Sequence, residues 1–527
     1  MIDYIGIGGG FMEFSRKDIH TSVLKASKYS QLTIDDDFNI PDTKEDIDKI
    51  IAKNGYIVVE DIIPEDGRVK VIGTVYFQVL YKTAGEKSDI EVYEGEIPFE
   101  DSVNVDGVTK NHHAESICKL EDITVSMINS RKLEVRGLIG DGVSVYEDVR
   151  VNCATDLENG QGIECQYKNA LITETVISKH DVFKIKEEID IPQNKPNIRE
   201  IMWSSVELRN MEMKPQEDKI IVRGEVEIFA IYKGQEEHLP IQYLFSVRAI
   251  TKEIECSGAS EGMVLDANAM LGKGDVLIRP DADGEDRVIA VEYSVNMNIK
   301  MYEDEEIRLL SDMYSPQVEI TPETECFSYE NLLMRNVAKA KINFRKRIAD
   351  NQTKFLQVCH VYGNVDVDDV EIHDDNVHVT GVVKASVMYI STDDDPMNCM
   401  EVDIPFEYTV DTVPLSSEDS VRIVPCIDQL NATLLNSEEV EIKAQVNLGI
   451  SIFARSKTDV ITDSVIEPID YNKKGAMPGI VGYIVKKGDT VWSVARKYYA
   501  TTESIKKLNN LESDYLNEGD RLIIVKS

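Results

Sequence analysis

The sequence predicts a mainly β protein, with three tandem β-sandwich or barrel-like repeat domains followed by a small α+β domain at the C-terminus. Three observations predict this fold class. Many segments alternate apolar and polar residues, which is typical of a strand with one buried face. These segments recur about every 150 residues along the chain. The last 45 residues instead follow a strand–helix–helix–strand pattern.

The repeat is clearest in three segments that share V-x-G, with a tyrosine eight positions after the glycine. The paired landmarks are Gly73 and Tyr81, Gly224 and Tyr232, and Gly381 and Tyr389. A second marker, Ile-Pro, precedes the first two glycines at Pro41 and Pro192, and Ala349 replaces the proline in the third copy. Each unit then ends near an aromatic residue at equivalent positions, namely Tyr146, Tyr302 and Phe453.

Each copy has the pattern of a β-rich unit. A glycine inside a strand predicts a bulge or a close backbone approach. The spacing of Ile47 with Ile50, and of Ile198 with Ile201, predicts a short helix after the Ile-Pro marker in the first two copies.

The pattern also predicts the domain boundaries. Residues 1–17 are expected to form a flexible N-terminus, and residues 18–150, 171–307 and 330–455 the three repeats. Residues 456–481 contain prolines, glycines and lysines and are expected to be a linker. Residues 482–527 form the C-terminal domain.

The C-terminal domain contains clear helix signals. Asp489 or Thr490 can cap a first helix, because either side chain can accept a bond from a free first-turn N–H. The buried face of this helix is predicted from one periodic set of residues, Val491, Val494, Ala495 and Tyr498. Thr502 is expected to cap a second helix, with Ile505 and Leu508 on its apolar side.

These residues resemble the LysM domain family. The resemblance depends on Tyr483-x-Val485, Gly488-Asp489-Thr490, Ala495 with Tyr498, Leu508-Asn509 and Gly519-Asp520-x-Leu522. It implies a βααβ fold that commonly binds N-acetylglucosamine glycans between two loops, here 488–491 and about 510–515. The ligand or partner loop residues are then Gly488, Asp489, Thr490, Val491, Trp492, Asn510 and Leu511.

Three repeats followed by LysM resemble the SipL-like family of clostridial spore-coat morphogenetic proteins, whose repeats are called SPOCS domains. The resemblance implies a non-enzymatic scaffold in the mother-cell cytoplasm at the forespore surface. The implied partners are the coat ATPase SpoIVA, bound through the LysM region, and other coat proteins. Peptidoglycan binding at the cell wall or spore cortex is the alternative function.

Several side chains of the C-terminal domain suit a protein partner. The candidates are the basic residues Lys486, Lys487, Arg496 and Lys497, together with Tyr499. Trp492 lies one position from the predicted buried face, so it either serves as an exposed anchor or completes a small core.

The composition excludes several function classes. A net charge of −38 argues against nucleic-acid binding and against docking on anionic lipid. Only residues 482–527 are weakly basic, with 8 basic and 6 acidic residues. The 8 cysteines are scattered singly, which favours a reducing compartment. The start of the chain does not have the pattern of a signal peptide, and no apolar run is long enough to span a bilayer.

No catalytic, cofactor or metal site is predicted. Ser260 lies in a G-x-S-x-G match, but the match lies between the halves of a β repeat and is interpreted as a loop. Gly6 to Gly10 have no following Lys-Ser/Thr, and Asp281-x-Asp283-Gly284 has too few acidic ligands for a calcium loop. The acidic run 366–375 and the pair His112-His113 are interpreted as solvated surface.

Overall fold

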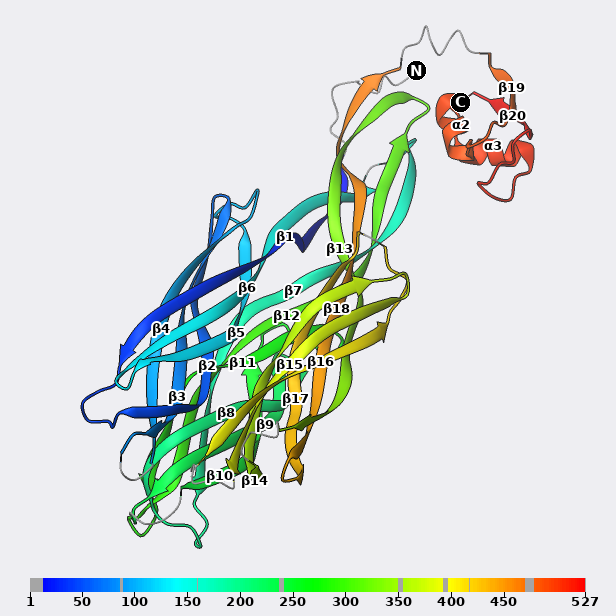
Figure 1. Cartoon of the computed structure of the whole chain (residues 1–527). Coiled ribbons are helices and arrows are strands. Elements are labelled where there is room, and N and C mark those ends of the chain that lie inside the picture. Colours follow the sequence, from blue (N-terminus) through cyan, green and yellow to red (C-terminus); the bar gives the residue numbers. More distant parts are fainter. Residues whose placement is uncertain are drawn as a thin grey trace.

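The computed structural model describes residues 13–85, 89–158, 160–236, 241–348, 354–391, 397–416, 418–469 and 478–526. Gly6 to Gly10, Ala349 and most of the predicted flexible N-terminus lie outside this part. The chain forms an elongated β-rich body with the small C-terminal domain beside one end (Figure 1). The predicted fold class is confirmed. No helix in the described part of the chain is long and apolar enough to cross a bilayer.

Each repeat consists of two three-stranded antiparallel sheets, one formed by its first, fifth and sixth strands and the other by its second, third and fourth. The first repeat contains β1 (Phe14–Asn39), β2 (Ile47–Glu65), β3 (Arg68–Thr83), β4 (Ile90–Asn104), β5 (His113–Asn129) and β6 (Lys132–Leu157). The second contains β7 (Glu164–Asp190), β8 (Ile198–Gln216), β9 (Lys219–Gly234), β10 (Gln242–Glu255), β11 (Val264–Pro280) and β12 (Asp286–Tyr314). The third contains β13 (Val318–Arg347), β14 (Phe355–Ile372), β15 (Asn376–Ser391), β16 (Asn398–Asp411), β17 (Ser420–Asn436) and β18 (Glu439–Pro468).

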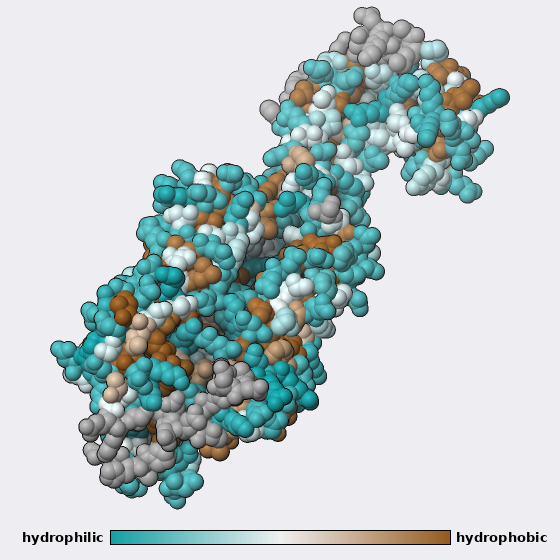
Figure 2. Space-filling model, viewed as in Figure 1, coloured by the Kyte–Doolittle hydropathy of each residue, from teal (hydrophilic) through white to brown (hydrophobic). Residues whose placement is uncertain are grey.

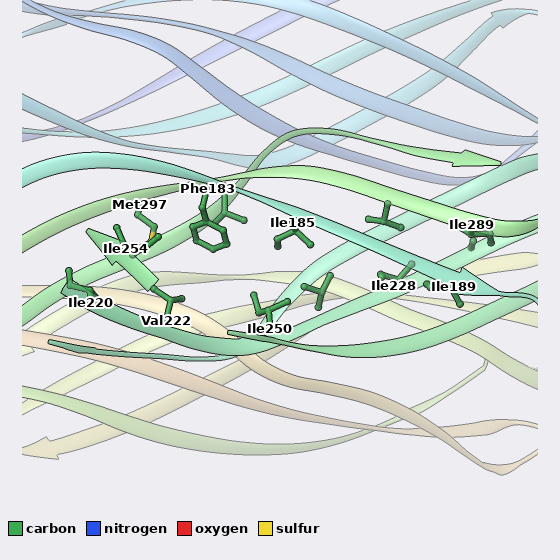
Figure 3. Close-up of a cluster of buried hydrophobic side chains, with 14 of the residues drawn as sticks. Phe183, Ile185, Ile189, Ile220, Val222, Ile228, Ile250, Ile254, Ile289 and Met297 are labelled. Atoms are coloured by element: carbon green, nitrogen blue, oxygen red, sulfur yellow. The ribbon is translucent and has the colours of Figure 1, made fainter. Parts of the chain in front are cut away.

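The core of each repeat lies between its two sheets. In the second repeat, Phe183, Ile185 and Ile289 from one sheet meet Val222 and Ile228 from the other (Figure 3). Val222 and Ile289 are fully buried. Each such side chain contributes roughly 1.5–3 kcal/mol on removal from water, so burial of the alternating apolar residues favours packing of the two sheets.

As predicted, the backbone of a neighbouring strand comes close to the glycines of the V-x-G motif. The neighbouring strand carries a β-bulge opposite each of them, beside Val59 for Gly73 and beside Val367 for Gly381. A Cβ added to Gly73 would lie 2.6 Å from the carbonyl oxygen of Val58, and one added to Gly381 would lie 2.3 Å from that of Asp366. Glycine is required here because any side chain would strike the backbone.

The helices predicted after the Ile-Pro markers are wrong. Ile47 and Ile50 lie in β2, and Ile198 and Ile201 lie in β8. β2 has register shifts after Ile47 and after Ile50, and β8 has the same two shifts. Each bulge inserts one residue and changes the alternation, so apolar residues recur three positions apart in a strand.

The first and last strands of each repeat extend beyond the boundaries predicted for that repeat. β18 runs to Pro468, so residues 456–468 of the predicted linker are strand. β1 begins at Phe14, inside the predicted N-terminal segment. The extra length of these strands gives the body its narrow end next to the C-terminal domain (Figure 1).

The three repeats are joined by two cores to which all of them contribute. Towards the narrow end, the six long strands β1, β6, β7, β12, β13 and β18 bury Ile19, Cys153, Ile172, Leu309 and Phe327 together. A second shared core contains Leu80, Trp203, Phe229, Tyr362 and Met388, from the other sheets of the three repeats. The repeats therefore form one body. Its visible face is largely hydrophilic, with apolar side chains in small separate groups (Figure 2).

Candidate functional site

The C-terminal domain has the predicted order of elements, β19 (Ile480–Ile484), α2 (Val491–Lys497), α3 (Thr502–Asn509) and β20 (Arg521–Val525). Thr490 caps α2, because its hydroxyl accepts from the backbone N–H of Ser493 at 3.1 Å. Thr501, not Thr502, caps α3. Val491, Val494 and Ala495 are buried as predicted.

The second helix differs in part from its prediction. Ile505 is buried, but Leu508 is 46% exposed. Asn509 has a role that its position in the sequence motif did not reveal. Its amide nitrogen donates to the carbonyls of Ile505 and Ile523, and its amide oxygen accepts from the N–H of Ile523 at 2.7 Å. Asn509 thus ties α3 to β20.

The first predicted ligand loop is organised by Asp489. Its carboxylate accepts from the hydroxyl of Tyr483 at 2.7 Å and from the N–H of Lys486 at 2.8 Å. The hydrogen bond from Tyr483 is the main cause that lowers the pKa of Asp489. Gly488 has φ of 90°, a left-handed conformation that favours glycine. Gly488 and Thr490 themselves are exposed.

The second predicted ligand loop contains both exposed and half-buried residues. Asn510 ends α3 in a left-handed conformation with φ of 54° and is exposed, whereas Leu511 is half-buried against the core of the domain. Tyr515 is 92% exposed. Both loops therefore offer exposed atoms to a ligand or partner.

The predicted partner-facing residues fall into two groups. Lys486, Lys487 and Lys497 are exposed, and the ammonium of Lys497 lies 5.5 Å from the ring centres of Tyr483 and Tyr498. Arg496 and Tyr499 instead contact the body of the same chain, as does Trp492.

Asp312, near the end of β12, is the centre of that contact. One nitrogen of Arg496, Nη1, lies 2.9 and 2.8 Å from the two carboxylate oxygens of Asp312. The indole N–H of Trp492 donates to the same carboxylate at 2.8 Å. Trp492 is half-buried and also packs on the core of its own domain, as the second interpretation of this residue predicted.

Tyr314 follows two residues later and belongs to the hydrophobic cluster of the C-terminal domain. It is 4% exposed, and its hydroxyl donates to the carbonyl of Ala500 at 3.0 Å. Its ring meets that of Trp492 edge-on, with 4.8 Å between centres. Burial raises the pKa of Tyr314 well above its usual value.

Two further carboxylates of the body bond to the C-terminal domain. Glu164 at the start of β7 accepts from the hydroxyl of Thr502 at 2.6 Å, and Glu319 in β13 accepts from the hydroxyl of Tyr499 at 3.5 Å. We call Glu164, Asp312, Tyr314 and Glu319 the acidic tip. No pattern in the sequence marks the acidic tip, because acidic residues are common throughout the body.

A second candidate site is a cavity of about 500 Å³ where the three repeats meet. The aromatic repeat markers Tyr146, Tyr302 and Phe453 all line it. Beside it, Glu115 lies 2.8 Å from Lys300 and 3.5 Å from Arg422. These charges belong to different repeats, so they link the three units.

The candidate catalytic and metal motifs of the sequence lie in turns or at the start of a strand. Ser260 lies in the turn between β10 and β11. Asp281 accepts from the N–H groups of Asp283 and Glu285, as in a hairpin turn. His112 lies in a turn, and His113 begins β5. The described residues contain no group of three or more His, Cys, Asp or Glu side chains arranged to hold a metal ion. All eight cysteines are free thiols.

Comparison with known families agrees with this organisation. The SPOCS domain of SipL matches residues 46–128, 197–278 and 354–435, and the LysM domain matches residues 483–525. Each SPOCS match spans the second to fifth strands of a repeat, so the long first and sixth strands lie outside it. No solved structure matches the chain. Three SPOCS domains followed by a LysM domain place the chain in the family of SipL-like proteins.

Proposed function

We propose that this protein is a non-enzymatic scaffold for assembly of the spore coat. The observation that supports this most strongly is the union of three SPOCS domains and a LysM domain in one chain. Both are binding domains without catalytic function. Fusion of the repeats through shared cores provides one long acidic surface on which several coat proteins can assemble.

The proposed docking partner is the coat ATPase SpoIVA, bound through the LysM domain. The protein would then work in the mother-cell cytoplasm at the forespore surface. The exposed lysines Lys486, Lys487 and Lys497, next to the loop of Gly488 and Thr490, support a protein contact at this domain. An acidic partner surface would suit these three ammonium groups.

A pull-down tests this partner. The full chain should retain the ATPase, and a chain without residues 482–527 should lose it. Equal retention by both chains would refute docking through the LysM domain. A fluorescent fusion followed through sporulation tests the location, since a ring around the forespore is expected and a diffuse vegetative signal contradicts it.

Glycan binding is the second candidate function, favoured by the two exposed LysM loops with Tyr515 at 92% exposure. It predicts that purified peptidoglycan sediments the full chain but not the chain without residues 482–527. Equal recovery of the two chains in the supernatant would exclude it.

A further inference from the structure

The α2 side of the LysM domain is occupied by the body of its own chain. This surface consists of Trp492, Arg496, Tyr499 and Thr502, and each of them bonds to a carboxylate of the acidic tip. Tyr314 also belongs to this contact, because its ring packs within the hydrophobic cluster of the LysM domain. We call these four LysM residues the α2 face.

The chemistry of this contact is specific. Asp312 receives three hydrogen bonds, two of them from a guanidinium, and bonds between charged groups are about twice as strong as neutral ones. Tyr314 adds a large buried ring with its hydroxyl satisfied by Ala500. The α2 face thus selects a carboxylate followed two residues later by an aromatic ring, both supplied here by the end of one strand, β12.

The charges on the two sides are complementary. The tip contributes three carboxylates, from Glu164, Asp312 and Glu319, whereas residues 482–527 have 8 basic and 6 acidic residues and the α2 face contributes the guanidinium of Arg496. Met313, between the two contact residues, is fully buried in a body cluster with Phe14 and Ile320. The strand end is therefore held rigidly, so little conformational freedom is lost when it meets the LysM domain.

We propose that the α2 face is a recognition surface for an extended acidic–aromatic segment, and that the acidic tip occupies it within the chain. A protein partner reaches this face only by presenting the same chemistry and displacing Asp312 and Tyr314. The inference extends the proposed function, since it states what kind of protein segment the LysM domain binds and what competes with it.

The test uses the full chain and a labelled peptide spanning residues 310–318, with binding followed by fluorescence anisotropy. The wild-type chain should bind the peptide weakly, because its own tip fills the face. Asp312→Ala should bind it roughly tenfold or more tightly. The variant's own tip loses its hydrogen bonds to Arg496 and Trp492, whereas the peptide keeps its aspartate and can form them. Adding Arg496→Ala to that variant should return binding to the weak level.

Controls separate recognition from damage to the fold. Glu303→Gln, an exposed carboxylate on the same strand, should behave as wild type. Peptides with alanine in place of the aspartate or the tyrosine should not bind the Asp312→Ala chain. Asp312→Asn keeps the shape of the side chain and serves if the alanine variant unfolds.

Two results would overturn the proposal: no peptide binding by either Asp312 variant, or equal binding with and without Arg496. The assay contains no coat protein. A failed ATPase pull-down with successful peptide binding would therefore reject the proposed partner and retain the α2 face as a recognition surface.

Discussion

Ser116 donates a hydrogen bond of 2.6 Å to Asp141, a carboxylate with no exposed surface in the first repeat. The other oxygen of Asp141 has no hydrogen-bond partner. Met297 and Leu448, five residues before the aromatic markers of the other repeats, are fully buried at the equivalent position. The first repeat therefore buries an acidic side chain where the other two repeats bury an apolar one.

Asp141→Asn is expected to stabilise the protein at pH 7. Burial raises the pKa of Asp141, so ionisation opposes folding, and the penalty grows as the pH rises through the pKa of the folded state. The gain should be on the order of 1 kcal/mol, because a buried oxygen without a hydrogen-bond partner costs more free energy when its group is charged. Denaturant unfolding from pH 4 to 8 measures it. The gain should vanish towards pH 4, and Asp106→Asn, in an exposed turn, should change nothing.

Glu115→Gln is expected to destabilise the junction of the three repeats. Burial of Glu115 opposes ionisation, but the hydrogen bond from His113 and the charges of Lys300 and Arg422 outweigh it and lower its pKa to about 2. The stabilisation is therefore present above the unfolded-state pKa and is lost as the pH falls through the folded-state value. The loss in Glu115→Gln at pH 7 should approach about 3 kcal/mol. Unfolding curves at pH 7 and pH 3 should show a smaller difference at pH 3, and a constant difference would contradict the assignment.

Gly73→Ala and Gly381→Ala should each destabilise the body by roughly 1–3 kcal/mol, the usual cost of overpacking. Their new methyl groups would meet carbonyl oxygens at 2.6 and 2.3 Å, and a sheet backbone yields little. Chemical denaturation measures the effect. Gly482→Ala is the matched control, because a Cβ there would meet nothing within 4 Å. A similar loss in the control would refute the steric explanation.

Thr490→Ala should loosen the first turn of α2 by about 1 kcal/mol, the usual cost of losing an N-cap. Amide exchange in the full chain is the appropriate measurement, because it reports α2 separately from the body. Protection of Val494, whose N–H bonds to the carbonyl of Thr490, should fall. Thr490→Ser keeps the capping oxygen and should retain protection, whereas equal loss in both variants would show that the cap is unimportant.

The repeat, the LysM domain and the alternation of apolar and polar residues along the strands could be predicted from the sequence alone. Each depends on contacts whose pattern is local or periodic, such as V-x-G with its tyrosine or the caps of α2. The starts of β2 and β8 were wrongly predicted as helices because each contains β-bulges. A residue inserted by a bulge breaks the period of two on which strand prediction depends.

The packing of the repeats against one another and the position of the LysM domain could not be predicted from the sequence. Leu80, Trp203 and Met388 lie in strands with the same alternating pattern as the strands inside each repeat. They nevertheless meet in one core shared by the three repeats. Asp312 is one of 95 acidic residues, and its partner Arg496 lies 184 positions away. A single sequence records which residues are apolar or charged. The contacts between distant residues depend on how the sheets pack against one another, and no local pattern of residues records this packing.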